Sequence, residues 1–336
     1  MGESVKRALV MSGGGAKGIW EVGCLSRLLE KERDLDFDFF LGVSAGSLNA
    51  TFLAQAPMED GCGGTRSKEA LRDQAAALAR IWHDEIQGTS DVYEGDIGEK
   101  IGLGQMIAVG IFGKDSLADA APIRSLIDRY VDPALLARSK RQLHIGAASL
   151  QSGAYFPFDQ STTDIRLAVK ASTAVPGIFA PIEWERDLLV DGAIRNNTPL
   201  GKAFDARPEI EIYVIQTSPI EGHVPAEVWD MRHKSALDVL YRIAVIMSDE
   251  VLRDDIVGAR EWNRAIKALE DVKVAVPAAA AAIDAEIAKL GKIRVPTRIY
   301  APPEKLLDDE LIFDKRDLDE MWLKGRARAD QPPTVW

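Results

Sequence analysis

The chain has 336 residues, enough for one large domain or two smaller ones with a well-buried core. Its net charge of −11, from 41 basic and 52 acidic residues, argues against binding to nucleic acid and against docking on anionic lipid by charge alone. With only Cys24 and Cys62, the chain offers neither a disulfide framework nor a cysteine-rich zinc site, and a reducing compartment is the default expectation.

The N-terminal part of the chain alternates between apolar runs and amphipathic segments. Residues 7–12 are predicted to form a buried strand, which leads through a glycine-rich loop at 13–18 into a helix over 19–33. A second strand is predicted over 37–43, and a further helix follows a turn at Ser44. This order of elements predicts a parallel sheet with helices on both faces.

The rest of the chain continues the pattern less regularly. Residues 57–68 are expected to form a flexible connection, and the glycine-rich segment 86–122 forms either a lid over a site or a surface excursion. Further helices are predicted through 71–82 and over 123–130, 235–269, 278–290 and 318–328, and further strands over 142–150, 188–190, 210–216 and 298–301.

Neither a domain boundary nor a membrane span is apparent along the chain. We therefore expect a single domain over 1–336, with a catalytic core at about 5–217 and a mainly helical extension at about 218–336. No apolar run approaches the length of a bilayer span, and the first predicted strand begins too early for a signal-peptide core. The expectation is a soluble, cytoplasmic protein, with secretion by a non-classical route left open.

Residues Gly42-Val43-Ser44-Ala45-Gly46 spell G-x-S-x-G between a predicted strand and a predicted helix, which is the context of a nucleophile elbow. Gly42 and Gly46 would let the chain turn sharply there. The Ser44 hydroxyl would then stand clear of the sheet edge, with the positive end of the helix near the reacting carbonyl. The alternative is a glycine-rich turn whose serine only caps the helix.

The loop from Gly13 to Gly18 allows two interpretations. It satisfies G-x-G-x-x-G, and Asp34, Asp36 and Asp38 lie near the place of a ribose-binding acid, which favours an NAD(P)-dependent oxidoreductase. That interpretation leaves G-x-S-x-G unexplained and puts the bulky charge of Lys17 at the turn. The second interpretation is an oxyanion hole, in which backbone N–H groups converge on a developing negative oxygen.

A serine nucleophile needs a base. The chain contains His83, His144, His223 and His233, of which the last two follow Asp191 in the order serine, acid, histidine. Both of these have the context of solvated loop or helix residues. Asp191 instead ends an apolar strand, where desolvation would raise its pKa and make it a better base. Its other interpretation is a turn-forming Asp-Gly pair.

Four blocks of the sequence resemble, in order, the motifs of patatin-like phospholipases. Residues 13–18 resemble the G-G-G-x-[KR]-G loop, 42–46 the serine elbow, and 171–181 the third block of the family. Asp191-Gly192-Ala193, followed by Asn197 and Pro199, matches D-G-[GA]-x-x-x-N-x-P. The resemblance thins after about Gln216.

This resemblance implies a three-layer α/β/α fold with a central, mostly parallel sheet and helical C-terminal additions. It implies a lipid acyl hydrolase, such as a phospholipase A or a carboxylic ester hydrolase, that works through an acyl-enzyme. Ser44 would be the nucleophile and Asp191 its direct base, in a dyad without histidine. The N–H groups of Gly13, Gly14 and Gly15 would form the oxyanion hole. Supporting roles would fall to Lys17, Gly18, Gly42, Gly46, Gly192, Asn197 and Pro199.

The resemblance also sets expectations for partners. It implies no cofactor and no metal, a lipid or acyl-ester substrate with transient contact to a membrane surface, and no nucleic acid. A catalytically silent scaffold or lipid-binding module is the alternative within the same fold. The presence of both Ser44 and Asp191 argues against it, because a silent relative has no chemical need for both.

Overall fold

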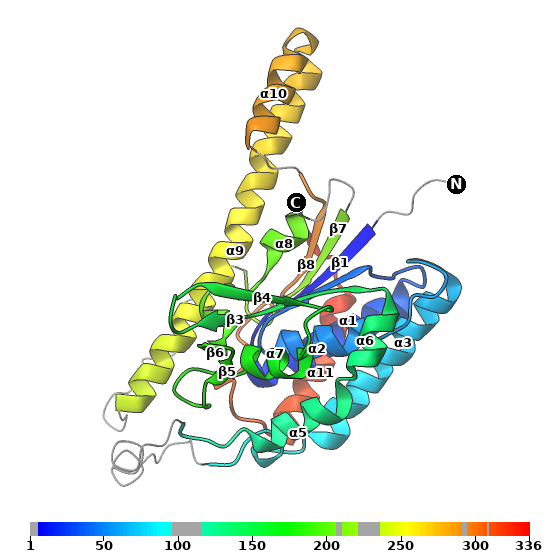
Figure 1. Cartoon of the computed structure of the whole chain (residues 1–336). Helices are drawn as coiled ribbons and strands as arrows, with labels where there is room; N and C mark the ends of the chain where they lie inside the picture. Colours follow the sequence, from blue (N-terminus) through cyan, green and yellow to red (C-terminus); the bar gives the residue numbers. More distant parts are fainter. Residues whose placement is uncertain (1–5, 96–115, 206–209, 221–235, 291–293, 308) are drawn as a thin grey trace.

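The computed structural model of the chain describes residues 6–95, 116–205, 210–220, 236–290, 294–307 and 309–336 (Figure 1). The strands in these ranges are β1 (Lys6–Met11), β2 (Phe39–Gly42), β3 (Gln142–Ser149), β4 (Tyr155–Asp159), β5 (Ile182–Trp184), β6 (Asp187–Asp191), β7 (Ile210–Ile215), β8 (Thr297–Tyr300) and β9 (Thr334–Val335). They form one sheet in the order β5-β6-β3-β2-β1-β7-β8-β9, and β4 pairs with β3 outside this path. The strands from β3 to β8 in this order run parallel to their neighbours, and the outer strands pair antiparallel.

Helices cover both faces of the sheet. They are α1 (Gly18–Lys31), α2 (Ala45–Ala54), α3 (Thr65–Arg80), α5 (Ala121–Tyr130), α6 (Pro133–Ser139), α7 (Ile165–Ser172), α8 (Leu200–Asp205), α9 (Ala236–Ala275), α10 (Ala280–Leu290) and α11 (Lys315–Ala329). The core on one face includes side chains of α1, α2, α3, α7 and α11, and the core on the other face includes side chains of α8 and α9. The fold is therefore the three-layer α/β/α arrangement that the sequence predicts.

The last four residues of β1 are apolar and buried, and their packing shows why. Leu9 and Met11 belong to the core on the α1 side, whereas Ala8 and Val10 belong to the core on the α9 side. Successive side chains of a strand point to opposite faces, so the part of a strand that is covered on both faces is apolar at successive positions.

The register of β3 brings two distant segments together. Its first residues pair with β2 as far as the pair Gly42 and Ile145, and its last residues pair with β6, beginning at Ala147 and Asp191. Strand β4 pairs with β3 across both stretches, so β2 and β6 share the opposite side of β3. The end of β6 therefore lies close to the turn that follows β2.

One expected connection is partly helical. Residues 57–68 were predicted to be a flexible connection, but α3 begins at Thr65. The Asp60 carboxylate accepts hydrogen bonds from the N–H groups of Arg66 and Ser67, which lie in the first turn of α3 and have no partner within the helix. This capping contact starts the helix before its apolar stripe begins.

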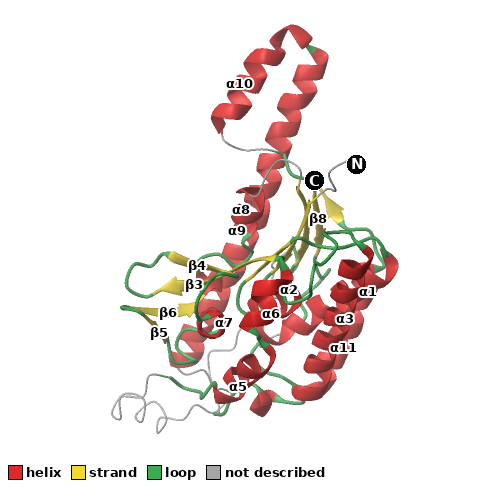
Figure 2. Cartoon of the chain, turned by 45° about the vertical axis from the view of Figure 1, so that its right-hand side comes forward, coloured by secondary structure: helices red, strands yellow, loops and turns green. Residues whose placement is uncertain are grey.

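The C-terminal part of the chain adds to the same sheet and packs against its helices. Strand β8 extends the sheet beside β7, and α11 packs along α1. The far end of α9 and the whole of α10 form a hairpin that projects away from the sheet (Figure 2). Among the described helices, none combines the length and the apolar character needed to cross a membrane. Of the segment 86–122, for which a lid and a surface excursion were both left open, residues 96–115 lie outside the described residues.

Candidate active site

Ser44 stands at a sharp turn between β2 and α2. Its backbone has φ 53° and ψ −129°, a conformation that costs a non-glycine residue about 1–3 kcal/mol. The two flanking glycines are required by space: a Cβ on Gly42 would lie 2.2 Å from the carbonyl oxygen of Gly46, and one on Gly46 would lie 2.4 Å from that of Met11. The segment therefore has the strained geometry expected of a nucleophile elbow.

Asp191 lies at the end of β6, and the Ser44 side chain lies near enough to its carboxyl group to lower the pKa of that group. Asp191 is 3% exposed and Ser44 is 8% exposed. The N–H of Ala193 also donates to the Asp191 carboxylate, at 2.9 Å. Burial raises the pKa of Asp191 to about 7, although the Ser44 side chain and the hydrogen bond from the Ala193 N–H act in the opposite direction. The carboxyl group therefore changes protonation near neutral pH.

The backbone N–H groups of the glycine-rich loop beside Ser44 differ in whether they already have a hydrogen-bond partner. The N–H of Gly13 donates to Oδ1 of Asn197 at 2.7 Å, and the carbonyl of Gly13 accepts from the Thr217 hydroxyl at 2.6 Å. Within the described part of the chain, the N–H groups of Gly14 and Gly15 have no hydrogen-bond partner. Gly15 has φ 52°, and a Cβ there would lie 2.2 Å from the carbonyl oxygen of Glu310, so only glycine fits.

The remaining motif residues hold this loop in place. Asn197 bridges the loop to α9, because its Nδ2 donates to the Ser248 hydroxyl at 2.9 Å. Lys17 is buried and forms an ion pair with Glu310 at 2.8 Å. Burial alone would lower the pKa of Lys17, but the charges of Glu310 and Asp249 outweigh it and raise that pKa. Lys17 is thus held as a cation that anchors the loop.

Two further glycines of the motifs are required by close packing, and the residue before Pro199 is held by a hydrogen bond. A Cβ on Gly18 would lie 2.9 Å from the Trp82 ring, and one on Gly192 would lie 2.4 Å from the carbonyl oxygen of Gly146. The N–H of Thr198, next to Pro199, donates to Asp255 of α9 at 3.0 Å. The loop after β6 is therefore tied to α9 at two successive residues.

A buried glutamate behind the glycine-rich loop had not been predicted. Glu21 accepts hydrogen bonds from the Ser12 N–H at 2.8 Å and from Nδ2 of Asn49 at 3.2 Å. Burial raises its pKa well above the usual range. The network joins Ser12, which follows β1 and precedes Gly13, to α1 and α2. A single acidic residue inside an apolar helical stripe was its only sequence signal.

The other residues considered from sequence have different surroundings. The Asp36 carboxylate forms a fully buried ion pair with Arg141 at 2.8 Å. Asp38 accepts from the Arg7 N–H, and Asp34 pairs with Lys68. All three proposed ribose-binding acids are thus engaged in contacts with the protein itself.

The histidines show no described link to Ser44. Nδ1 of His83 lies 3.2 Å from the Asp319 carboxylate, and the His144 ring packs against Tyr155. Neither belongs to the residues that line the pocket at Ser44. His223 and His233 lie outside the described residues.

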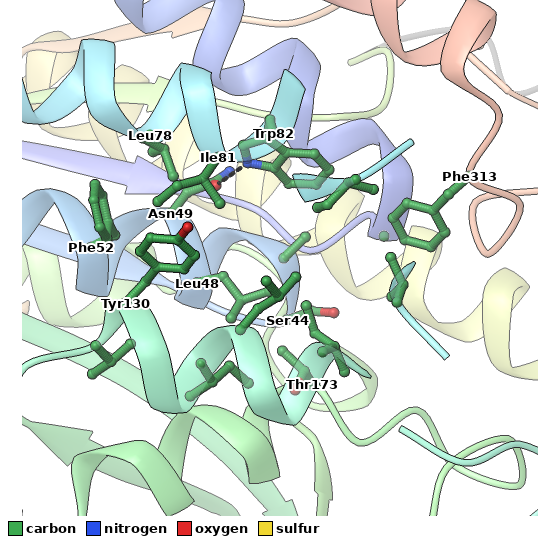
Figure 3. Close-up of a pocket in the computed structure, with 18 of the residues that line it drawn as sticks. Ser44, Leu48, Asn49, Phe52, Leu78, Ile81, Trp82, Tyr130, Thr173 and Phe313 are labelled. Carbon is green, nitrogen blue, oxygen red and sulfur yellow. Dashed lines mark hydrogen bonds between the residues drawn. The ribbon is translucent and has the colours of Figure 1, made fainter. Parts of the chain in front are cut away.

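Ser44 lies in the wall of a pocket that encloses about 880 Å³ of empty space including its open mouth (Figure 3). Most of the lining side chains are aliphatic or aromatic. They come from α2, from α3 and the turn after it, from α5, and from two segments near 175–179 and 311–313. These two segments contribute Val175, Phe179, Leu311 and Phe313. An apolar pocket beside a candidate nucleophile suits an acyl chain.

A comparison with known protein families agrees with the motifs. The model of the family described as patatin-like phospholipase matches residues 9–204, more than half of the chain. Among solved structures, the crystal structure of VipD from Legionella pneumophila is similar, with 14% sequence identity and a TM-score of 0.45 over 99% of this chain and 68% of VipD. The family match covers all four sequence blocks, and the chain belongs to the patatin-like phospholipase family.

Proposed function

We propose that this protein is a serine-dependent lipid acyl hydrolase in which Ser44 is the nucleophile and Asp191 its direct base. Membership of the family supports lipid hydrolysis in general. The observation that supports the two residues is the placement of the buried Asp191 carboxyl group beside Ser44, whose side chain lowers the pKa of that carboxyl group while burial raises it to about 7. A base with a pKa near the working pH is the most effective in proton transfer.

In the proposed reaction, the Asp191 carboxylate takes the proton of the Ser44 hydroxyl while Oγ attacks the ester carbonyl carbon. The tetrahedral intermediate collapses to an acyl-enzyme, and Asp191 returns the proton to the departing alcohol. Water then attacks the acyl-enzyme, with Asp191 again taking the proton. Oγ of Ser44 leaves with a proton from Asp191, which restores the starting state.

The proposed oxyanion hole differs from the sequence expectation in one donor. Gly13 was expected to contribute its N–H, but that group donates to Asn197. We assign the developing negative oxygen to the N–H groups of Gly14 and Gly15, which lack partners among the described residues. The positive end of α2, which begins at Ala45, adds to the stabilisation.

We also propose that the chain acts as a single domain. Leu311 and Phe313 belong to the C-terminal part of the chain and line the pocket of Ser44. The carbonyl oxygen of Glu310 accepts a hydrogen bond from the N–H of Ala16 in the glycine-rich loop. The substrates of such an enzyme reside in membranes or micelles, so the proposal includes transient contact with a lipid surface.

The pH dependence of hydrolysis tests the proposal. Only the ionised form of Asp191 accepts a proton, so kcat/KM for a soluble ester such as p-nitrophenyl butyrate should rise as the pH rises toward 7 and level off above it. Below the inflection, the increase should be about tenfold per pH unit. Initial rates between pH 5 and 9 measure it.

Histidine variants are the control for this profile. Alanine at His83, His223 or His233 should leave the inflection in place, because the proposal assigns it to Asp191. Loss of the inflection in one of these folded variants, or a flat profile in the unmodified protein, would contradict the proposed base.

A further inference from the structure

We infer that the aromatic pair Phe52 and Tyr130 closes the acyl-binding part of the pocket and sets the longest acyl chain that the protein accepts well. The inference rests on the proposed function, because it takes Ser44 as the point at which the acyl carbonyl is held. It goes further by naming the residues that select the substrate.

The pocket follows one side of α2 away from Ser44. Ala45, Leu48, Asn49 and Phe52 all line it, and their spacing of three, one and three residues puts them on one face of the helix. A helix rises about 1.5 Å per residue, so Phe52 lies about 12 Å along the axis from Ser44. An extended hydrocarbon chain advances about 1.3 Å per carbon, as carbon–carbon bonds of about 1.5 Å with tetrahedral angles dictate, so about nine or ten carbons span this distance.

The walls of this part of the pocket suit methylene groups and not a head group. Trp82 and Asn49 are among the few lining residues with polar side-chain atoms, and they satisfy each other: Nε1 of Trp82 donates to Oδ1 of Asn49 at 2.9 Å. Nδ2 of Asn49 donates to the Gly18 carbonyl and to Glu21. A polar head group placed here would lose its hydrogen bonds to water without replacement, which costs several kcal/mol.

An aromatic pair forms the end of the pocket, and a residue outside the pocket holds one of its rings in place. The rings of Phe52 and Tyr130 meet edge to face, with centroids 6.4 Å apart and planes at 77°. The Tyr130 hydroxyl donates to Glu85 at 2.5 Å, and Arg129 pairs with Glu85 at 2.8 Å. Figure 3 shows the two rings at the end of the pocket away from Phe313, with Leu48 between them and Ser44. The hydrogen bond fixes Tyr130, so the end wall resists displacement by a longer chain.

The test is the chain-length profile of Phe52→Ala. For p-nitrophenyl esters of four to fourteen carbons, each below its micelle concentration, kcat/KM of the unmodified protein should fall beyond about ten carbons. Removal of the Phe52 ring opens the end wall, and the ratio of kcat/KM for the C14 ester to that for the C8 ester should rise at least tenfold. Tyr130→Phe keeps the ring and should change this ratio less than Phe52→Ala does.

Phe156→Ala is the matched control. Phe156 is also half-buried, but it packs against Phe158 and Trp184 and does not line the pocket. This variant loses the same atoms and should keep the chain-length profile of the unmodified protein. An unchanged C14 to C8 ratio in folded, active Phe52→Ala overturns the inference, and so does an equal change in Phe156→Ala.

Binding measurements separate this inference from the proposed catalysis. Saturated fatty acids of eight and fourteen carbons can be titrated into Ser44→Ala, with and without Phe52→Ala, by calorimetry. Tighter binding of the C14 acid relative to the C8 acid only after Phe52→Ala supports the end wall even if no ester is hydrolysed. Equal relative affinities in both proteins contradict it, whatever the fate of the catalytic proposal.

Discussion

Ser44→Ala should abolish ester hydrolysis, with a loss of kcat/KM of about 10⁴-fold or more. Alanine removes the attacking oxygen but keeps the Cβ, so the turn at φ 53° is no more strained than before. The main structural loss is the interaction of the Ser44 hydroxyl with the Asp191 carboxyl group. Hydrolysis of a soluble p-nitrophenyl ester, together with the circular dichroism spectrum and the melting temperature, measures both effects.

Ser125→Ala provides the comparison. Ser125 lies on α5, where its hydroxyl donates to the carbonyl of Ala121, and it does not line the pocket. This variant should retain the activity of the unmodified protein. Comparable hydrolysis by folded Ser44→Ala would mean that another group is the nucleophile.

Asp191→Asn should reduce kcat/KM by about 10⁴-fold. The amide has nearly the same shape, and its oxygen can still accept the hydrogen bond from the N–H of Ala193. It cannot take the proton of Ser44. Activity measured at pH 8, where the carboxylate of the unmodified protein is ionised, gives the clearest difference.

The same variant has a predictable effect on stability. The pKa of Asp191 is raised on folding to about 7, so the folded state holds this proton more tightly than the unfolded state. The contribution of Asp191 to stability is therefore lost as the pH rises from about 4 to about 7. Asparagine carries no charge to bury, and the melting temperature of Asp191→Asn at pH 8 should be no lower than that of the unmodified protein. An inactive variant with a much lower melting temperature would point to a structural role for Asp191.

The parts of the site that lie in compact motifs were accessible from the sequence. The Ser44 turn and the glycine-rich loop each combine a short pattern with a strand before and a helix after, so local rules describe them. The contacts that hold them are not local. Asn197 and Gly13 are 184 residues apart, and Lys17 pairs with Glu310, so no pattern within a short window contains both partners. In the sequence, the helices that form the pocket walls have the pattern of ordinary amphipathic helices, because a lining residue and a core residue have the same apolar character.

The secondary structure also divides into elements that local patterns predict and elements that they do not. The long apolar strands and helices were predicted, whereas the short elements β4, β5, β9, α6, α7 and α8 were not. Pro157 argues against a strand, but β4 is an antiparallel branch that tolerates it. The start of α6 did carry a signal: Asp132 caps the helix by accepting from Ala134 and Leu135, and Pro133 is its first residue. Asp164 caps α7 in the same way.

The central claim is an activated serine at position 44, and labelling of the purified protein with a fluorophosphonate tests it most directly. The labelled protein is digested, and the modified residue is identified by peptide mass spectrometry. The proposed dyad predicts a single adduct on Ser44, absent from Ser44→Ala and formed much more slowly in Asp191→Asn. An adduct on another serine, or no adduct in folded protein that hydrolyses esters, would contradict the assignment of Ser44 as the nucleophile.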